Sequence, residues 1–233
     1  MPEASWSAER FGDSDGPMVA VFVHGGFWRA RWAADTIAPL ARACAAADPH
    51  PWVWNLEYPR VGMAGGGWPG TAIAVRDALR AAVDAAAGRP VVVVGHSAGG
   101  HLALWAAAHH PVAAVVSLAG VCDLEEGVTT GIGNGAVLEL LGAAPDSDLY
   151  AAASPIARLP LGSPTLLIHG DADEDVPVSQ SQRFASAARA AGDDCELHEL
   201  PGGGHFEVID PAGRAWPILS GRLAALVAGP LSA

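Results

Sequence analysis

The junction between four consecutive valines and the sequence Gly95-His96-Ser97-Ala98-Gly99 is the feature that most constrains how this chain can fold. The valines, at positions 91–94, lie between Pro90 and the first of these glycines, and a short β-branched run bounded in this way predicts a fully buried strand. Residues 97–109 predict a helix directly after it. A Gly-x-Ser-x-Gly sequence at such a junction is typical of a nucleophile elbow, a cramped turn that glycines permit and that lifts the serine oxygen out of the sheet edge.

The rest of the chain alternates predicted strands and predicted helices. Strands are predicted over residues 18–23, 52–56, 91–94, 112–118, 166–169 and 196–200, with room for at most one more near 6–11. Helices are predicted over residues 36–47, 71–87, 97–109, 179–191 and 214–227. This alternation predicts an α/β fold with a mostly parallel, doubly wound sheet and helices on both faces.

A chain of 233 residues is expected to form one domain, over residues 1–233. Residues 121–154 are the one long stretch that we expect to be irregular. Because long loops inside compact domains are usually lids or binding segments, we interpret this stretch as a short insert that forms a minimal cap.

Composition limits the partners that we expect. A formal net charge of −12 argues against nucleic acid and anionic membranes. No apolar run reaches the roughly 18 residues of a membrane span, and the first residues lack the pattern of a signal peptide, so we expect a cytoplasmic protein. The three cysteines, Cys44, Cys122 and Cys195, are widely spaced and are expected to be buried thiols. The oligomeric state is left open.

A serine hydroxyl is a weak nucleophile, so Ser97 needs a base, an acid that orients the base, and donors for an oxyanion. Ligands of parallel sheets bind at the carboxyl ends of the strands, and the candidates follow predicted strands. The candidate base is His205, in a Gly-Gly-Gly-His sequence after the last predicted strand. Three carboxylates compete for the acid role after the strand at 166–169: Asp171, Asp173 and Asp175.

Acyl transfer builds negative charge on a carbonyl oxygen, and N–H donors must already be in place for it. The first expected donor is the backbone N–H of Ala98, the residue after Ser97. The others are expected from Gly26 and Phe27, in the loop after the strand at 18–23, where glycine lets the backbone approach the substrate.

Aromatic residues near these loops are candidates for the substrate pocket. They are Trp28, Trp68 and Phe206. For the two tryptophans, packing in the core is an equally good interpretation. The other six tryptophans, Trp32 among them, are expected to pack in the core.

The remaining histidines suggest supporting roles. His24, His96 and His169 belong to turns near the site, where a structural role is expected, and His101 is expected to pack or to hydrogen-bond locally. No motif has metal-ligand spacing such as His-Glu-x-x-His, so no metal site is predicted.

With these residues assembled, the chain resembles the α/β-hydrolase superfamily over essentially its whole length, including the order Ser, Asp, His. The residues from Asp173 to Pro177 resemble the acid turn of small α/β-hydrolases, which favours Asp173; Asp171 is then expected to hold the loop and Asp175 to cap the next helix. The chain is most similar to small esterases and to kynurenine formamidase (arylformamidase) relatives with a His-Gly-Gly-x-Trp motif, here at 24–28.

The resemblance implies a serine hydrolase with Ser97, Asp173 and His205 as its catalytic triad and with no cofactor. The sequence Glu57-Tyr58-Pro59-Arg60 departs from the pattern, since many relatives have Tyr-Arg directly. The predicted function is cleavage of a small carboxylic ester through an acyl-enzyme at Ser97, so the expected partner is a small-molecule ester or amide.

The sequence also allows three alternatives to this function. The first is arylformamidase activity, the hydrolysis of an amide of the N-formylkynurenine type. A peptidase like the catalytic domain of prolyl oligopeptidase is less favoured, because 233 residues leave no room for a propeller domain. A third, from another class, is a ligand receptor on the same fold with slow turnover.

Overall fold

A computed structural model describes residues 5–110, 112–142 and 146–228 of the chain. The two ends of the predicted domain, 1–4 and 229–233, and residues 143–145 of the predicted insert therefore lie outside the described residues.

The described residues form a seven-stranded sheet with the strand order β1-β3-β2-β4-β5-β6-β7. The strands are β1 (Ser7–Phe11), β2 (Val19–Val23), β3 (Trp52–Glu57), β4 (Val91–His96), β5 (Ala114–Leu118), β6 (Thr165–Gly170) and β7 (Cys195–Leu200). Every neighbouring pair is parallel except β1 with β3, which is antiparallel. The predicted mostly parallel sheet is confirmed.

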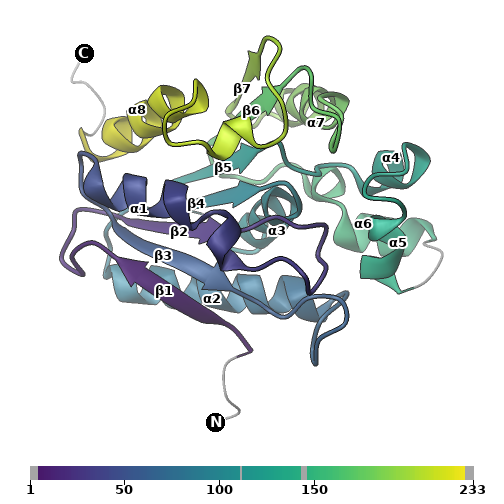
Figure 1. Ribbon diagram of the computed structural model, residues 1–233, viewed down its shortest axis with the longest axis horizontal. Helices are drawn as coiled ribbons and strands as arrows, with labels where there is room; N and C mark the ends of the chain where they lie inside the picture. Colours follow the sequence, from purple (N-terminus) through teal and green to yellow (C-terminus); the bar gives the residue numbers. More distant parts are fainter. Residues whose placement is uncertain (1–4, 111, 143–145, 229–233) are drawn as a thin grey trace.

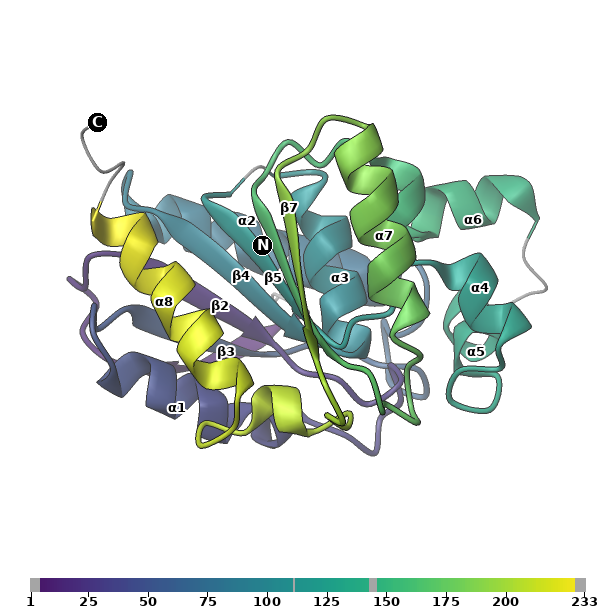
Figure 2. The same cartoon turned by 90° about the horizontal axis from the view of Figure 1, so that it is seen from above.

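Helices cover both faces of the sheet (Figures 1 and 2). One face carries α1 (Ala38–Ala46) and α8 (Ala215–Ala228), and the other carries α2 (Gly70–Ala86), α3 (Ala98–Ala107) and α7 (Ser179–Ala190). The valine run of β4 shows why both faces of the sheet need to be covered. Val92 and Val94 pack with the α1 and α8 side, whereas Val91 and Val93 pack with the α2, α3 and α7 side. Because side chains alternate along a strand, a run that is apolar at every position suits a sheet buried on both faces.

The insert is helical, so the expectation of an irregular stretch over 121–154 was wrong. It contains α4 (Leu124–Thr129), α5 (Ala136–Leu141) and α6 (Ser147–Ala153), which gather beyond one end of the sheet (Figures 1 and 2). Asp123 and Asp146 accept backbone N–H bonds at the starts of α4 and α6. These helices have only six or seven residues, too few for the apolar periodicity that identified the longer helices.

The cysteines of the described residues are as expected from the sequence. The cysteines are free and buried. Short 3₁₀ helices are present at η1 (Ala34–Thr36), η2 (Pro155–Arg158) and η3 (Glu207–Ile209). Of the helices in the described ranges, none has the length and apolar character that crossing a bilayer requires.

The parallel register brings several loops to one edge of the sheet. Val23 at the end of β2 pairs with Gly95 of β4, and His96 pairs with Leu118 at the end of β5. The loops that leave β2, β4, β6 and β7 therefore meet at their carboxyl ends, which is where parallel sheets bind ligands.

Candidate active site

Ser97 lies between β4 and α3 in a backbone conformation that is rare for a residue with a side chain. Its φ and ψ are 56° and −121°, and positions of this kind cost about 1–3 kcal/mol and cluster at functional sites. Its backbone N–H donates to the carbonyl of Leu118 at 2.9 Å, which fixes the turn to β5. The local geometry is that of the predicted elbow.

The two flanking glycines are required by close backbone approach. A Cβ on Gly95 would lie 2.2 Å from the carbonyl oxygen of Gly99, and a Cβ on Gly99 would lie 2.1 Å from that of Val23. Real contacts of this length do not occur, so larger residues would push β4, α3 and the end of β2 apart. The glycines of the motif therefore bring Ser97 against the loop that follows β2.

His205 and Asp173 form a direct hydrogen bond. Nδ1 of His205 donates to Oδ2 of Asp173 at 2.7 Å, because an ionised carboxylate can only accept. This bond fixes the tautomer and leaves Nε2 of His205 as the nitrogen available to a nucleophile. The His205 ring and Ser97 line the same cavity. The structure thus brings together the three residues predicted to act as a triad.

Asp173 is held as a carboxylate. Its side chain is fully buried, which by itself would raise its pKa. Hydrogen bonds from His169 and His205, and the backbone N–H of Val176 at 2.8 Å, outweigh that effect and hold the pKa of Asp173 well below its ordinary range. The backbone N–H of Asp175 adds a further bond at 2.9 Å. The negative charge that orients His205 therefore persists at neutral pH.

A second histidine supports Asp173 at the same carboxylate oxygen that His205 contacts. Nε2 of His169 lies 3.3 Å from Oδ2 of Asp173 and 2.9 Å from the carbonyl oxygen of Val176. Both partners are acceptors, so Nε2 carries the proton, and Nδ1 accepts from the hydroxyl of Ser181 at 2.7 Å. His169 and Ser181 are fully buried. This chain of bonds makes His169 a positioning residue for the acid, in line with the structural role expected for it.

The loop that carries His205 is anchored to its neighbours. Nε2 of His96 donates to the carbonyl oxygen of His205 at 3.1 Å, and burial lowers the pKa of His96 to about 3, so the ring is neutral. Oδ1 of Asp171 accepts from the backbone N–H of Gly202 at 2.6 Å. The expectation that Asp171 holds the loop is confirmed.

The loop after β2 has an unusual backbone. Gly26, Phe27 and Trp28 have φ values of 108°, 54° and 57°, so three successive residues are left-handed. A Cβ on Gly25 would lie 2.9 Å from Cβ of Ser97, which shows how closely this loop approaches the elbow.

The three backbone N–H groups predicted as oxyanion donors are those of Gly26, Phe27 and Ala98. None of them donates to another group within the described ranges. The Ala98 N–H also lies in the first turn of the ten-residue helix α3, where such groups have no helical partner and favour negative charge. All three are therefore free to serve an oxyanion.

The Glu57-Tyr58-Pro59-Arg60 sequence braces this loop from behind. The hydroxyl of Tyr58 donates to the carbonyl oxygen of His24 at 2.6 Å, and Arg60 Nη1 donates to Nε2 of His24 at 3.1 Å. Arg60 also pairs with Glu57. Nδ1 of His24 donates to the Gly25 carbonyl at 2.7 Å, and burial lowers the pKa of His24 to about 4. Residues 57–60 depart from the family pattern, but their side chains still support the His-Gly-Gly turn.

A cavity of about 180 Å³, here called the inner cavity, opens beside Ser97. It is lined by Gly26, Phe27, Arg31, Trp32, Thr36, His96, Ser97, Asp175, His205 and Phe206. The predicted substrate-binding residue Phe206 is among them.

The two tryptophans predicted to wall the pocket do not line it. Trp28 is fully buried in the core, with its ring edge-on to His101 at 5.2 Å, and Trp68 packs edge-on against Trp105 at 5.2 Å. Core packing, the other interpretation weighed for them, is the correct one. Trp32 was expected in the core and lines the inner cavity instead. Its position four residues beyond the His-Gly-Gly-x-Trp motif was the available signal.

His101 packs in the core, as one of the two expectations had it, and its Nε2 donates to the carbonyl oxygen of Ala153 at the end of the insert, at 2.9 Å. One further expectation was wrong. Asp175 does not cap a helix: α7 begins at Ser179, and its N-cap residue Val178 makes no side-chain bond. The side chain of Asp175 lines the inner cavity and a second one next to it.

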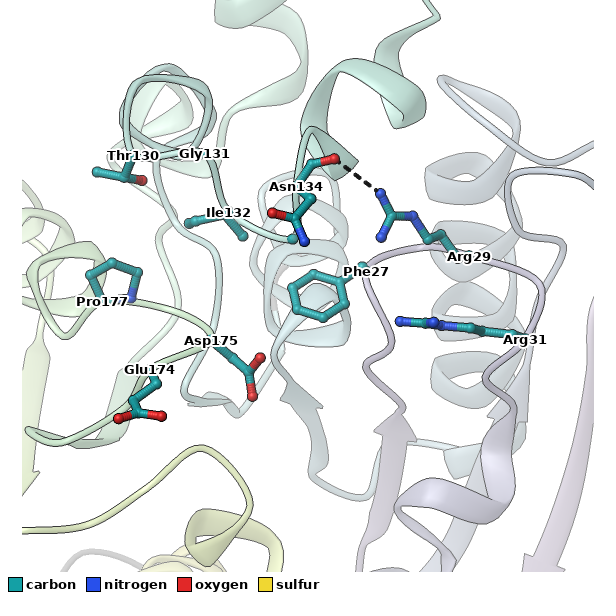
Figure 3. A pocket seen from close by; sticks show the side chains of 11 residues that line it. Phe27, Arg29, Arg31, Thr130, Gly131, Ile132, Asn134, Glu174, Asp175 and Pro177 are labelled. Atoms are coloured by element: carbon teal, nitrogen blue, oxygen red, sulfur yellow. Dashed lines mark hydrogen bonds between the residues drawn. The ribbon is translucent and has the colours of Figure 1, made fainter.

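This second cavity, here called the outer cavity, has a volume of about 330 Å³ and is shown in Figure 3. It lies between the loop after β2, residues 130–134 of the insert and the loop after β6. Phe27, Arg31 and Asp175 line both cavities, so the outer cavity adjoins the inner one at these side chains. The sequence contains no signal for Arg31, and it suggested Asp175 only as a candidate acid or helix cap and not as a residue of this cavity.

Among the residues that the structure describes, no group of three or more His, Cys, Asp or Glu side chains is placed to hold a metal ion.

Comparisons with solved structures bear on the fold. A truncated carbohydrate esterase from gut microbiota aligns with a TM-score of 0.78 and 18% identity, covering 97% of this chain and 98% of that one. An acetyl ester-xyloside bifunctional hydrolase from Caldicellulosiruptor lactoaceticus gives 0.76 and 22%, covering 94% and 86%. At these identities the likeness establishes the fold alone, which is that of the α/β-hydrolases.

Comparisons of sequence bear on the family. Esterase LipC of Mycobacterium tuberculosis (strain ATCC 25618 / H37Rv) is 32% identical over 226 residues, covering 83% of this chain and 54% of LipC, so the chain spans about half the length of this curated relative. The profile of the prolyl oligopeptidase family matches residues 72–215, which include Ser97, Asp173 and His205. The match does not depend on the length argument given above against a peptidase activity. The chain belongs to the prolyl oligopeptidase family.

Proposed function

We propose that this protein is a serine hydrolase that cleaves small carboxylic esters through an acyl-enzyme at Ser97. The observation that carries the proposal is the hydrogen-bonded pair His205–Asp173, at 2.7 Å, beside a serine held in a strained elbow and lining the same cavity as the histidine. The match to a protein named as an esterase supports the choice of an ester over other acyl substrates.

Each residue has a definite part in the proposed reaction. Nε2 of His205 takes the proton of Ser97 as Oγ attacks the ester carbonyl, and Asp173 stabilises the imidazolium that forms. The N–H groups of Gly26, Phe27 and Ala98 receive the developing oxyanion. His205 then protonates the departing alkoxide. In the second half, His205 takes a proton from water as the water attacks the acyl carbonyl. His205 then returns this proton to Oγ of Ser97 as the carboxylic acid leaves.

The inner cavity supports a short acyl group. Its volume of about 180 Å³ is enclosed in part by the aromatic rings of Phe27, Trp32 and Phe206. Apolar walls of this kind favour a small apolar group and leave little length for a chain to extend.

The test is a series of p-nitrophenyl esters with acyl groups from acetyl to decanoyl, assayed with the wild type and Ser97→Ala. We expect the highest kcat/KM for the shortest acyl groups. Ser97→Ala should lose at least about a thousandfold in kcat, because no other group can form the acyl-enzyme. Near-normal turnover by Ser97→Ala would refute the mechanism, and a preference for the longest chains would refute the short-acyl assignment.

Arylformamidase activity is the second candidate. A formyl group is smaller than an acetyl group, so the same inner cavity that favours short acyl groups also favours it. Adding N-formylkynurenine to the substrate series separates the two, since an arylformamidase would give it the highest kcat/KM. A slow-turnover receptor would instead bind a ligand and show no appreciable turnover on any member of the series.

A further inference from the structure

We propose that the outer cavity binds a zwitterionic leaving group, so that the preferred substrates are short-acyl esters whose alcohol or phenol carries both an ammonium and a carboxylate. This inference rests on the proposed esterase function and adds the class of its leaving group.

Opposite charges face each other across the outer cavity. Arg31 comes from the loop after β2, and Glu174 and Asp175 come from the loop after β6. Figure 3 shows the guanidinium of Arg31 on one side of Phe27 and the two carboxylates on the other. Because Arg31 and Asp175 also line the inner cavity, a leaving group attached to an acyl carbonyl at Ser97 would pass between them.

These three charges have no ionic partner within 4.0 Å among the residues with described positions. The neighbouring Arg29 differs, since its guanidinium binds both carboxylate oxygens of Glu139, at 2.6 and 2.7 Å. Arg31 and Asp175 are exposed and do not close on each other. A ligand with both charges could bridge the space that separates them.

Arg31 is also held at the cavity wall. Its guanidinium carbon lies 5.4 Å from the ring centroid of Trp32, a cation–π distance, and Trp32 itself lines the inner cavity. An arginine placed in this way presents its N–H fork to a carboxylate with little conformational loss. The guanidinium therefore suits the acidic group of a leaving group that starts at Ser97.

The arrangement discriminates against ligands of a single charge. A purely cationic group would meet the carboxylates but also Arg31, and a purely anionic group would meet Arg31 but also Glu174 and Asp175. An uncharged group would gain neither attraction. Charge complementarity, and repulsion of the wrong charge, are how polar sites obtain specificity. The zwitterion alone satisfies both sides of the cavity.

The test uses four acetate esters of phenols that share the acyl group and the phenol ring. They are O-acetyl-tyrosine (zwitterion), O-acetyl-tyramine (cation), 3-(4-acetoxyphenyl)propionate (anion) and 4-methylphenyl acetate (neutral). At pH 7 the ammonium and carboxylate groups are charged. We expect kcat/KM for the zwitterion to exceed that for the neutral ester by about tenfold or more, and to exceed those for both singly charged esters.

Variants assign the effect to individual charges. Arg31→Gln should remove the advantage of the zwitterion over the cation, and Asp175→Asn should remove its advantage over the anion. In each variant the readout is the ratio of kcat/KM for the charged ester to that for 4-methylphenyl acetate. Matched controls are Arg42→Gln and Asp77→Asn, which change net charge equally at ion pairs on α1 and α2 and should leave these ratios unchanged.

The binding of free tyrosine to Ser97→Ala, measured by calorimetry, is a second readout that needs no turnover. Loss of this binding in Ser97→Ala/Arg31→Gln supports the inference. The inference is overturned if the neutral ester, or either singly charged ester, reacts as well as the zwitterion while the esters are cleaved. If none of the esters is cleaved, the proposed function fails, and absence of tyrosine binding then overturns the inference as well.

Discussion

The inner and outer cavities meet at Phe27 but satisfy their polar groups in opposite ways. Behind His205 in the wall of the inner cavity, Asp173 and His169 are buried and bonded to partners from the protein itself. Where the outer cavity adjoins the inner one, the charges of Arg31 and Asp175 are exposed and stand apart.

This difference separates chemistry from substrate choice. A buried polar group must find its partners within the fold, so its geometry is fixed before any substrate arrives. An exposed charge is satisfied by water and can exchange that water for a ligand group. We therefore expect changes at the inner network to alter all substrates together and changes at the outer charges to alter one substrate relative to another.

Asp173→Asn gives the largest expected effect at the inner network. The amide removes the charge that fixes the His205 tautomer, so kcat on p-nitrophenyl esters of every acyl length should fall about 10³- to 10⁴-fold. The matched control is Asp171→Asn, which makes the same charge change two residues away but keeps an oxygen that can accept from Gly202. Similar losses in the two variants, measured by steady-state kinetics, would contradict the role given to Asp173.

Gly99→Ala should come next. The added Cβ would lie 2.1 Å from the carbonyl oxygen of Val23, so the end of β2 must move away from the elbow. We expect a loss of roughly 1–3 kcal/mol in the free energy of unfolding, measured with urea, and a drop in kcat for all esters because the donors at Gly26 and Phe27 move too. Gly221→Ala on α8 is the control, since nothing lies within 4 Å of its Cβ position. Wild-type kinetics in Gly99→Ala would show that the close approach is dispensable.

His169→Leu should have a smaller effect with a distinct pH signature. Without the His169 bond, the pKa of Asp173 rises toward its ordinary value of 3.8. In the wild type, the stability contributed by Asp173 is fully present above pH 3.8 and is lost as the pH falls from there through its depressed folded pKa. In the variant, the folded pKa lies closer to 3.8, so the total loss is smaller and is complete at a higher pH.

Urea unfolding from pH 5 down to pH 2.5 measures that difference, and kcat at pH 7 should fall by about tenfold. His169→Gln retains an N–H donor and should recover part of both. Identical pH profiles for the wild type and His169→Leu would mean that His169 only fills space.

The smallest effect should come from salt. Raising ionic strength from 0.1 to 1 M shortens the screening length from about 10 to about 3 Å. This should lower kcat/KM for O-acetyl-tyrosine by about two- to threefold relative to 4-methylphenyl acetate, because only the former uses the exposed charges. Equal salt dependence for the two esters would remove the contrast between the cavities.

The contrast between the two cavities also explains which parts of the site could be predicted from the sequence. The elbow at Ser97 and the Gly-Gly-Gly-His sequence at His205 are local, because turn geometry dictates which residues stand side by side. The alternation of strands and helices likewise follows from local periodicity. The parallel sheet then brings the ends of β2, β4, β6 and β7 to one edge, so the inner site follows from topology.

The outer cavity could not be predicted in this way. Arg31, Asp175 and residues 130–134 come from three separate loops, and no short pattern indicates that they face one space. The sequence left Trp28 open between core and pocket and placed Trp32 in the core, because three successive left-handed residues turn the chain after Gly25, a conformation that sequence periodicity does not show. The helices α4, α5 and α6 could not be predicted because each is too short to show the apolar periodicity of a helix.

The most direct test of the central claim is to trap the acyl-enzyme. The wild type is mixed with p-nitrophenyl acetate, quenched in acid within the first turnovers, and analysed by intact-protein and peptide mass spectrometry, with Ser97→Ala treated in parallel. The account predicts one acetyl group, on the peptide that contains Ser97, and none in the variant. Ester consumption with no acetyl group on Ser97, or with equal acetylation of the variant, would contradict it.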